Sequence, residues 1–201
     1  MKKNYEMDMC SGPILGKLLT FTIPLIFSGI LQLLFNAADV IVVGRFAGSQ
    51  SLAAVGSTTA LINLMINIFI GLSVGVNVIV ARYYGAKREK DVQDTIHTAM
   101  ALSIVSGLFL IIVGQLLSRP MLELMGTPDD VIDKSTIYMR IIFIGMPANM
   151  IYNFGSAILR AVGDTKRPLY FLTAAGVINV VLNLFFVIMF QMDVAGVALA
   201  T

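Results

Sequence analysis

The sequence has little charge. Only 13% of its 201 residues are Asp, Glu, Lys or Arg, whereas 57% are hydrophobic. Soluble domains carry about 25% charged and about 45–50% apolar residues, so this balance excludes a soluble globular enzyme, a disordered chain and a nucleic-acid-binding protein. Cys10 is the single cysteine, His97 the single histidine, and there is no Trp. We therefore expect no internal disulfide, no Cys/His metal site and no enzymatic activity.

The sequence instead contains long hydrophobic runs. A helix needs about 20 apolar residues to span a bilayer. Five runs approach or exceed this length, and a sixth begins near the end: 14–43, 52–81, 95–117, 135–159, 169–190 and 194–201. The runs do not alternate and are longer than barrel strands, which have about ten residues, and only helices and closed barrels satisfy their own backbone groups in hydrocarbon. The sequence predicts an all-α integral membrane protein with five transmembrane helices and the start of a sixth.

Lys and Arg are distributed unevenly between the two sides that these spans define. With a cytoplasmic N-terminus, one side carries Lys2, Lys3, Lys17, Arg82, Lys87, Arg88, Lys90, Arg160, Lys166 and Arg167. The other side carries only Arg45, Arg119, Lys134 and Arg140. Short cytoplasmic loops are enriched in Lys and Arg. We therefore predict a multi-pass protein of the plasma membrane with a cytoplasmic leader, 1–13.

Polar side chains recur at helical spacing within four of the five runs. They are Gln32, Asn36 and Asp39; Thr59, Asn63 and Asn67; Asn149, Asn153 and Ser156; and Asn179 and Asn183. Residues at this spacing share one face of a helix. Such groups either hydrogen-bond between helices or line a water-filled cavity, because facing lipid is costly. Repetition over four helices favours a shared polar interior.

Asp39 is the only acid within a run, and an intramembrane acid is by default a functional candidate. Burial disfavours the charged form of a carboxylate, whereas amide donors favour it. A carboxylate subject to both effects can take up and release a proton, or bind a sodium ion. The alternative is that Asp39 lies close enough to the outer surface to be hydrated. It follows Pro24 by about 15 residues, and Asn183 follows Leu169 by about 14 residues; at about 1.5 Å per residue both reach the same half of the membrane.

One segment, Gly71-Leu72-Ser73-Val74-Gly75, matches the G-x-S-x-G pattern of hydrolases. That motif requires a strand–turn–helix context and a histidine partner, whereas this segment lies within an apolar run. The same glycines form G-x-x-x-G, which permits close contact between helices. We favour this structural role for Gly71 and Gly75.

Several longer segments carry a family resemblance. The first run reads TIPLIFSGILQLLFNAADVIVVGRFAG, and LAAVG follows it. Further along are ARYYGAKR, LRAVGDTKRPLY, INVVLNLFF and, at the end, DVAGVALAT. In this order, and over essentially the whole chain, the sequence resembles the N-terminal half of a multidrug and toxic compound extrusion (MATE) transporter.

The resemblance implies a bundle of twelve helices in two lobes, of which the C-terminal lobe is absent here. It also implies efflux of small amphiphilic, often cationic compounds, driven by a proton or sodium gradient without another cofactor. The family's acid on the first helix matches Asp39, and its polar positions on the fifth match Asn179 and Asn183. Some members carry a second acid at the place of Asn183, so Asp39 is the only carboxylate of this group.

With Asn36 on the face of Asp39, these four residues form the expected cation-coupling group. The substrate cavity is expected to be lined by Gln32, Asn63, Asn67, Asn149 and Asn153. Two alternatives remain. One is a flippase of lipid-linked precursors from the same superfamily, and the other is a truncated fragment that does not transport.

Overall fold

The computed structural model describes residues 12–201, so most of the predicted leader 1–13, including Cys10, lies outside the described residues. The elements are α1 (Ile14–Val42), η1 (Val43–Ala47), α2 (Ser49–Gly85), α3 (Glu89–Leu124), α4 (Asp129–Ile144), α5 (Met146–Ala161), α6 (Lys166–Leu184), η2 (Phe185–Met189) and α7 (Asp193–Ala200). The two η elements are π-helical, and residues 12–201 contain no strand. Four helices are long and apolar enough to cross a membrane, or five if the bent pair α4–α5 is one span. The predicted all-α membrane fold is confirmed.

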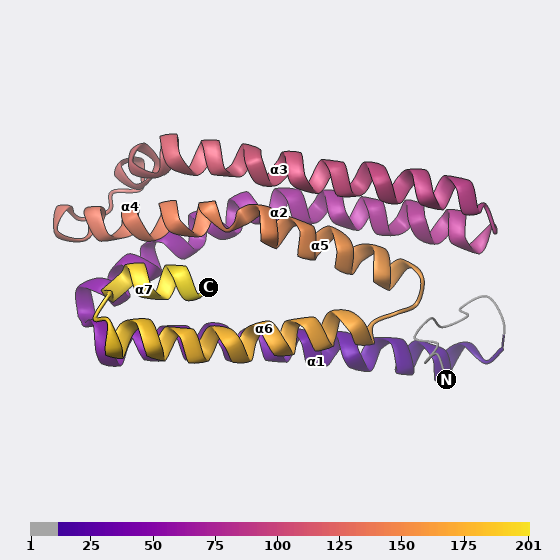
Figure 1. The fold of residues 1–201 in the computed structure, drawn as a ribbon, viewed down its shortest axis with the longest axis horizontal. Helices are drawn as coiled ribbons and strands as arrows, with labels where there is room; N and C mark the ends of the chain where they lie inside the picture. Colours follow the sequence, from indigo (N-terminus) through magenta and orange to yellow (C-terminus); the bar gives the residue numbers. More distant parts are fainter. Residues whose placement is uncertain (1–11) are drawn as a thin grey trace.

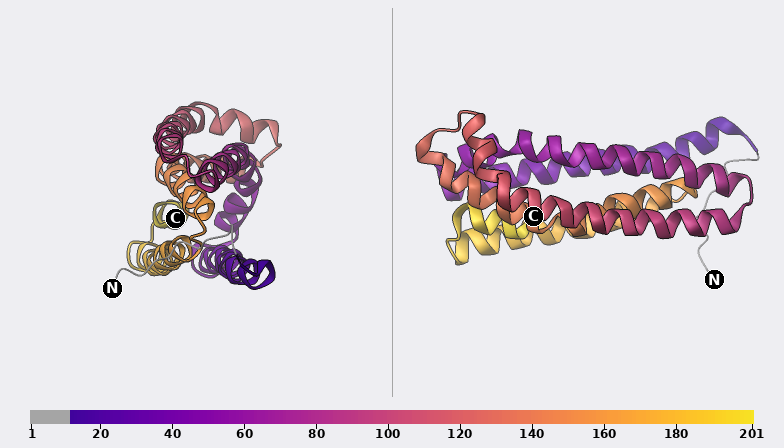
Figure 2. Two further views of the ribbon diagram at one scale, coloured as in Figure 1. Left: turned by 90° about the vertical axis from the view of Figure 1, so that its right-hand side faces the viewer. Right: turned by 90° about the horizontal axis from the view of Figure 1, so that it is seen from above.

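The helices form two groups (Figure 1). α1 and α6 pack side by side, while α2, α3, α4 and α5 pack together as the second group. α7 lies between the groups and packs against α4 and α6 (Figures 1 and 2). The connections 86–88 and 162–165 lie at the same end as the start of α1, which we call the basic end; the turns 125–128 and 190–192 lie at the opposite end.

The helices extend beyond the apolar runs that predicted them. Residues 82–94 lie between two of the predicted runs, but α2 continues to Gly85 and α3 begins at Glu89. Residues 118–134 likewise shrink to a turn at 125–128. Charged residues such as Lys, Arg and Glu favour helix, so a change in polarity marks where a helix meets water and not where it ends.

The predicted single helix 135–159 is broken in two. α4 and α5 meet at Gly145 with a bend of 49°. Pro147 has no backbone N–H to donate to the preceding turn, and its ring clashes with that turn's carbonyl. The bend therefore has a local cause in the sequence.

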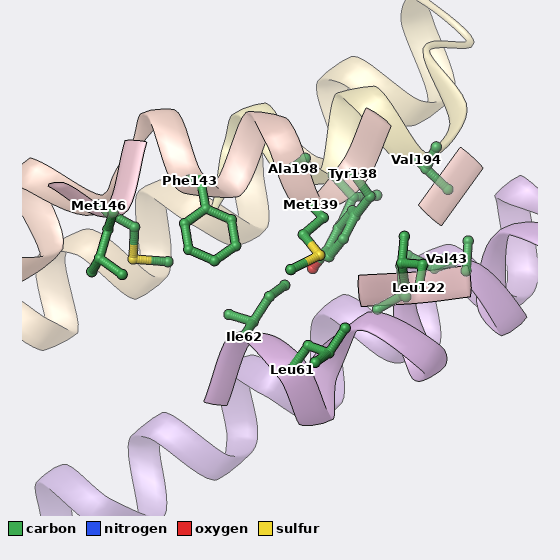
Figure 3. Packing of buried hydrophobic residues seen from close by; sticks show 14 of the residues in the cluster. Val43, Leu61, Ile62, Leu122, Tyr138, Met139, Phe143, Met146, Val194 and Ala198 are labelled. Carbon is green, nitrogen blue, oxygen red and sulfur yellow. The ribbon is translucent and has the colours of Figure 1, made fainter. Parts of the chain in front are cut away.

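The apolar core lies among α2, α3, α4, α5 and α7, and Figure 3 shows part of it. Met139 and Phe143 of α4 are fully buried, and they point towards Leu61 and Ile62 of α2. Val194 of α7 belongs to the same cluster. α7 is thus fixed to the larger helix group by apolar contacts along its buried side.

Close helix contacts occur at other glycines than the sequence predicted. Among residues 12–201, a Cβ added at Gly71 or Gly75 would meet nothing within 4 Å, so no described helix makes the predicted close contact at these two glycines. At Gly107 of α3 an added Cβ would lie 2.4 Å from Cα of Pro147, and at Gly176 of α6 it would lie 1.9 Å from the ring of Phe35. The close approaches are α3 to the α4–α5 bend, and α6 to α1.

Gly107→Ala should destabilise the bundle by about 1–3 kcal/mol, the usual effect of overpacking a core. The added methyl group would meet backbone at Pro147, which no rotamer change can relieve. Gly75→Ala is the matched control and should be neutral or stabilising by up to about 1 kcal/mol, because its surroundings are open and Ala favours helix. Thermal unfolding in detergent measures both variants. Equal melting temperatures would contradict the assigned contact.

Candidate functional site

A hydrogen bond joins the acid of α1 to an amide of α6. Nδ2 of Asn183 donates to Oδ1 of Asp39. Asn183 is fully buried, and Asp39 is half-buried. Both precede a change of helix type, because η1 begins four residues after Asp39 and η2 begins two residues after Asn183. The hydrogen bond therefore lies where both helices leave α geometry. π-Helical turns are frequent at functional sites.

Asn179 lies one turn before Asn183 and links α6 to the end of α7. Its Nδ2 donates to the carbonyl oxygen of Ala200 at 3.2 Å and to Oγ1 of Thr201 at 3.3 Å. The structure therefore brings together three of the four predicted cation-coupling residues, Asp39, Asn179 and Asn183, with α7 beside them. Asn36 shares the helix face of Asp39 but is exposed.

Two amide oxygens of this cluster have no donor. Oδ1 of Asn179 and Oδ1 of Asn183 are buried and accept no hydrogen bond from any residue of 12–201. Buried polar atoms in proteins are nearly always paired, so each exception needs an explanation. These two amide oxygens, the carboxylate of Asp39 and the hydroxyl of Thr201 are all oxygen atoms, the ligand type that hard cations prefer. Such a group can hold a proton on the carboxylate or a hard cation among the oxygens.

Two members of the surroundings were missed from the sequence. Tyr138 of α4 is 8% exposed and interacts electrostatically with Asp39. An aromatic residue in an apolar run is read as core, so no spacing rule singles out Tyr138. Thr201 is the last residue of the chain, and the sequence gives no partner for it.

A comparison with known families identifies the family of this chain. The MatE family profile matches residues 24–185. The chain belongs to the MatE family. Among curated proteins, it is 35% identical over 162 residues to the probable multidrug resistance protein YoeA of Bacillus subtilis, covering 81% of this chain and 35% of YoeA. It is 30% identical over 194 residues to the probable multidrug resistance protein YpnP of the same organism, covering 96% of this chain and 44% of YpnP.

Solved structures agree with the family assignment. This MatE chain superimposes on a MOP superfamily transporter from Pyrococcus furiosus with a TM-score of 0.86 and 28% sequence identity. The match covers 92% of this chain and 41% of the transporter. The MatE chain thus spans less than half the length of the relatives it matches, as expected of one lobe.

Among residues 12–201, none of the predicted cavity amides is hydrogen-bonded to the Asp39 cluster. Gln32, Asn63, Asn67 and Asn149 are exposed, and Asn153 donates to Oδ1 of Asn149 at 2.7 Å. None of the five lines either of two surface grooves, of about 430 and 360 Å³. The larger groove is lined by Val76, Ile79, Tyr83, Asp91, Asp94, Thr95, Thr98, Ala99 and Leu102, and the smaller by Phe46, Ala47, Val187, Ile188, Gln191 and Asp193.

The other acids of the MatE lobe do not assemble into a metal site. Among residues 12–201, no group of three or more His, Cys, Asp or Glu side chains is placed to hold a metal ion. Asp39 therefore differs from the multi-carboxylate sites of divalent cations, because its potential oxygen partners are amides and a hydroxyl.

Proposed function

We propose that the protein containing this lobe is a secondary active multidrug efflux transporter, which exports small amphiphilic, often cationic compounds in exchange for protons or sodium ions. The family assignment supports the transport class. The observation that carries the coupling role is the contact between Asp39 and Asn183 beside two unpaired, buried amide oxygens. A membrane acid in such surroundings is a functional candidate.

In the proposed cycle, the coupling ion binds at Asp39. A proton or sodium ion neutralises the carboxylate, and the hydrogen bond from Asn183 is then weakened or redirected. The unpaired Oδ1 atoms of Asn179 and Asn183 are available to a sodium ion in this step. An ion changes the conformational equilibrium only by binding one state more tightly than the other, and a bond that joins α1 to α6 gives it that opportunity.

The substrate is proposed to bind between this lobe and a second one. Transporters built from repeats bind their substrates near the midplane, at the interface between the repeats. The exposed amides Gln32, Asn36, Asn63 and Asn67 support this proposal, because polar groups on a membrane helix face a partner or a wet cavity. In this arrangement they line the substrate cavity, and the C-terminal lobe supplies the other wall.

We further propose that the protein resides in the plasma membrane with its N-terminus in the cytoplasm. The connections at the basic end carry Lys87, Arg88, Lys166 and Arg167 at or beside them. Cytoplasmic loops carry this excess of Lys and Arg. The Asp39 cluster would then lie in the outer half of the membrane.

Transport by the purified full-length protein in proteoliposomes tests the proposal. A fluorescent amphiphilic cation, ethidium, should move against its gradient when a pH or sodium gradient is imposed, and should stop when the gradient is collapsed. The gradient that drives transport identifies the ion. Movement of a lipid-linked diphosphate without any gradient-driven ethidium transport would contradict the proposal.

A further inference from the structure

A polar cluster outside the Asp39 site ties α7 to two other helices. Nζ of Lys134 on α4 lies 2.6 Å from Oδ2 of Asp193, the first residue of α7, and 3.2 Å from Oγ of Ser51 on α2. Ser51 also donates to Oδ1 of Asp193. Both oxygens of the carboxylate are therefore engaged, each by a different helix.

The backbone around this cluster is also unusual. Gln191 has φ 51° and Asp193 has φ 52°, so one residue of the turn before α7 and the first residue of α7 adopt the left-handed region. Residues other than glycine keep this backbone conformation only when the surrounding structure holds them in it. The contacts from Lys134 and Ser51 are the fixing interactions at Asp193.

The charge state of Asp193 fits this role. Partial burial opposes its charge, but the hydrogen bonds from Lys134 and Ser51 and the nearby ammonium group outweigh burial, so the pKa of Asp193 lies below its ordinary value. The carboxylate is therefore ionised at neutral pH, where Lys134 is its cationic partner.

Residues further along α7 reach the cation-coupling cluster. Residues 193–200 cover about 12 Å at 1.5 Å per residue. Asp193 is held by Lys134 and Ser51, and Ala200 and Thr201 accept hydrogen bonds from Asn179. In Figure 1, α7 lies between α4 and α6, in agreement with these contacts on both sides.

We propose that Lys134 and Asp193 are positioning residues, whose ion pair sets α7 at the place where Ala200 and Thr201 meet Asn179. The ion pair acts on transport through α7 and does not touch the ion or the substrate. This inference rests on the proposed function for its effect on transport, but the position of α7 can be measured without transport.

Distance measurement between two spin labels tests the position of α7. The labels are placed at Val177 of α6 and Leu199 of α7, which are 55% and 53% exposed. The experiment uses the full-length protein in lipid nanodiscs, with every native cysteine replaced by serine. Lys134→Gln and Asp193→Asn should each abolish the single narrow distance distribution of the parent. The charge exchange Lys134→Asp with Asp193→Lys should restore it.

The matched control is an ion pair at the same end of the bundle. Arg119 of α3 lies 2.9 Å from Asp133 and 3.1 Å from Glu123, and neither contact involves α7. Arg119→Gln should leave the label distribution unchanged. Unchanged distributions in both Lys134→Gln and Asp193→Asn would overturn the proposal, as would a charge exchange that folds but does not restore the parent distance.

A transport measurement separates positioning from a general loss of structure. Lys134→Gln should raise the ion concentration for half-maximal efflux by about 2- to 30-fold, the range expected for an indirect coupling. The maximal rate at saturating ion should be retained. If the protein showed no ion-driven efflux at all, the proposed function would fail, whereas the label distances would still decide the position of α7.

Discussion

Asp39→Asn is expected to lower the rate of gradient-driven efflux by about 100-fold, while membrane insertion and folding remain intact. An amide has nearly the shape of the carboxylate, and its oxygen can still accept the hydrogen bond from Asn183. The α1–α6 contact should therefore persist. The amide, however, neither takes up a proton nor neutralises a sodium ion, so ion binding can no longer change the equilibrium between transporter conformations.

The control for Asp39→Asn is an exposed acid. Asp130 lies in the first turn of α4 and is exposed. Asp130→Asn should reduce efflux little, because a solvated carboxylate at a helix end is not part of the proposed ion site. Efflux is measured with ethidium in proteoliposomes under the gradient that drives the parent protein. Parent-level, gradient-dependent efflux by Asp39→Asn would refute the coupling role.

A binding measurement on the same variant gives a second test. If the ion and a cationic drug both neutralise Asp39, each should weaken the binding of the other by the same factor, because linkage between binding sites is reciprocal. In Asp39→Asn, ethidium affinity should no longer depend on pH or on sodium concentration. Retained ion dependence would place the coupling group elsewhere.

Part of the site follows from sequence spacing alone. Asp39 follows Pro24 by 15 residues and Asn183 follows Leu169 by 14 residues, on two helices that run in the same direction, and the structure joins them by a hydrogen bond. The helical repeat is regular enough to predict depth in a membrane over such distances. It does not predict which helices are neighbours, so the contact itself required the structure.

The contacts of α7 could not be predicted from spacing. Lys134 and Asp193 are 59 residues apart, and Ser51 and Asp193 are 142 residues apart. Polar residues beside an apolar run are interpreted as solvated, and only tertiary packing shows that these three meet. Thr201 has the same difficulty, because its partner Asn179 lies on another helix.

The glycines show why the G-x-x-x-G motif alone did not predict where helices approach closely. G-x-x-x-G states that a helix face is small, which permits a close approach without requiring one. Gly71 and Gly75 have open surroundings, whereas Gly107 and Gly176 meet Pro147 and the ring of Phe35. The neighbour across the interface, and not the glycine spacing, determines where two helices approach closely.

Asn183→Leu is expected to raise the ion concentration for half-maximal efflux by about 10- to 100-fold, as removal of a ligand's supporting group does at metal sites. Leucine is similar in size, so the fully buried position remains filled. The variant removes the donor to Asp39 and one of the two unpaired amide oxygens. Ethidium binding in the absence of the ion should be unchanged, because Asn183 is covered on all sides.

The matched control replaces another amide within a membrane helix. Nδ2 of Asn77 on α2 donates to the carbonyl oxygen of Ala157 on α5 at 2.7 Å, a contact that joins two helices away from Asp39. Asn77→Leu should lower stability by about 1 kcal/mol or less and leave the ion dependence of efflux unchanged. An equal shift in both variants would assign Asn183 a packing role alone. A shift confined to Asn183→Leu would show that the hydrogen bond between α6 and α1 belongs to the ion site.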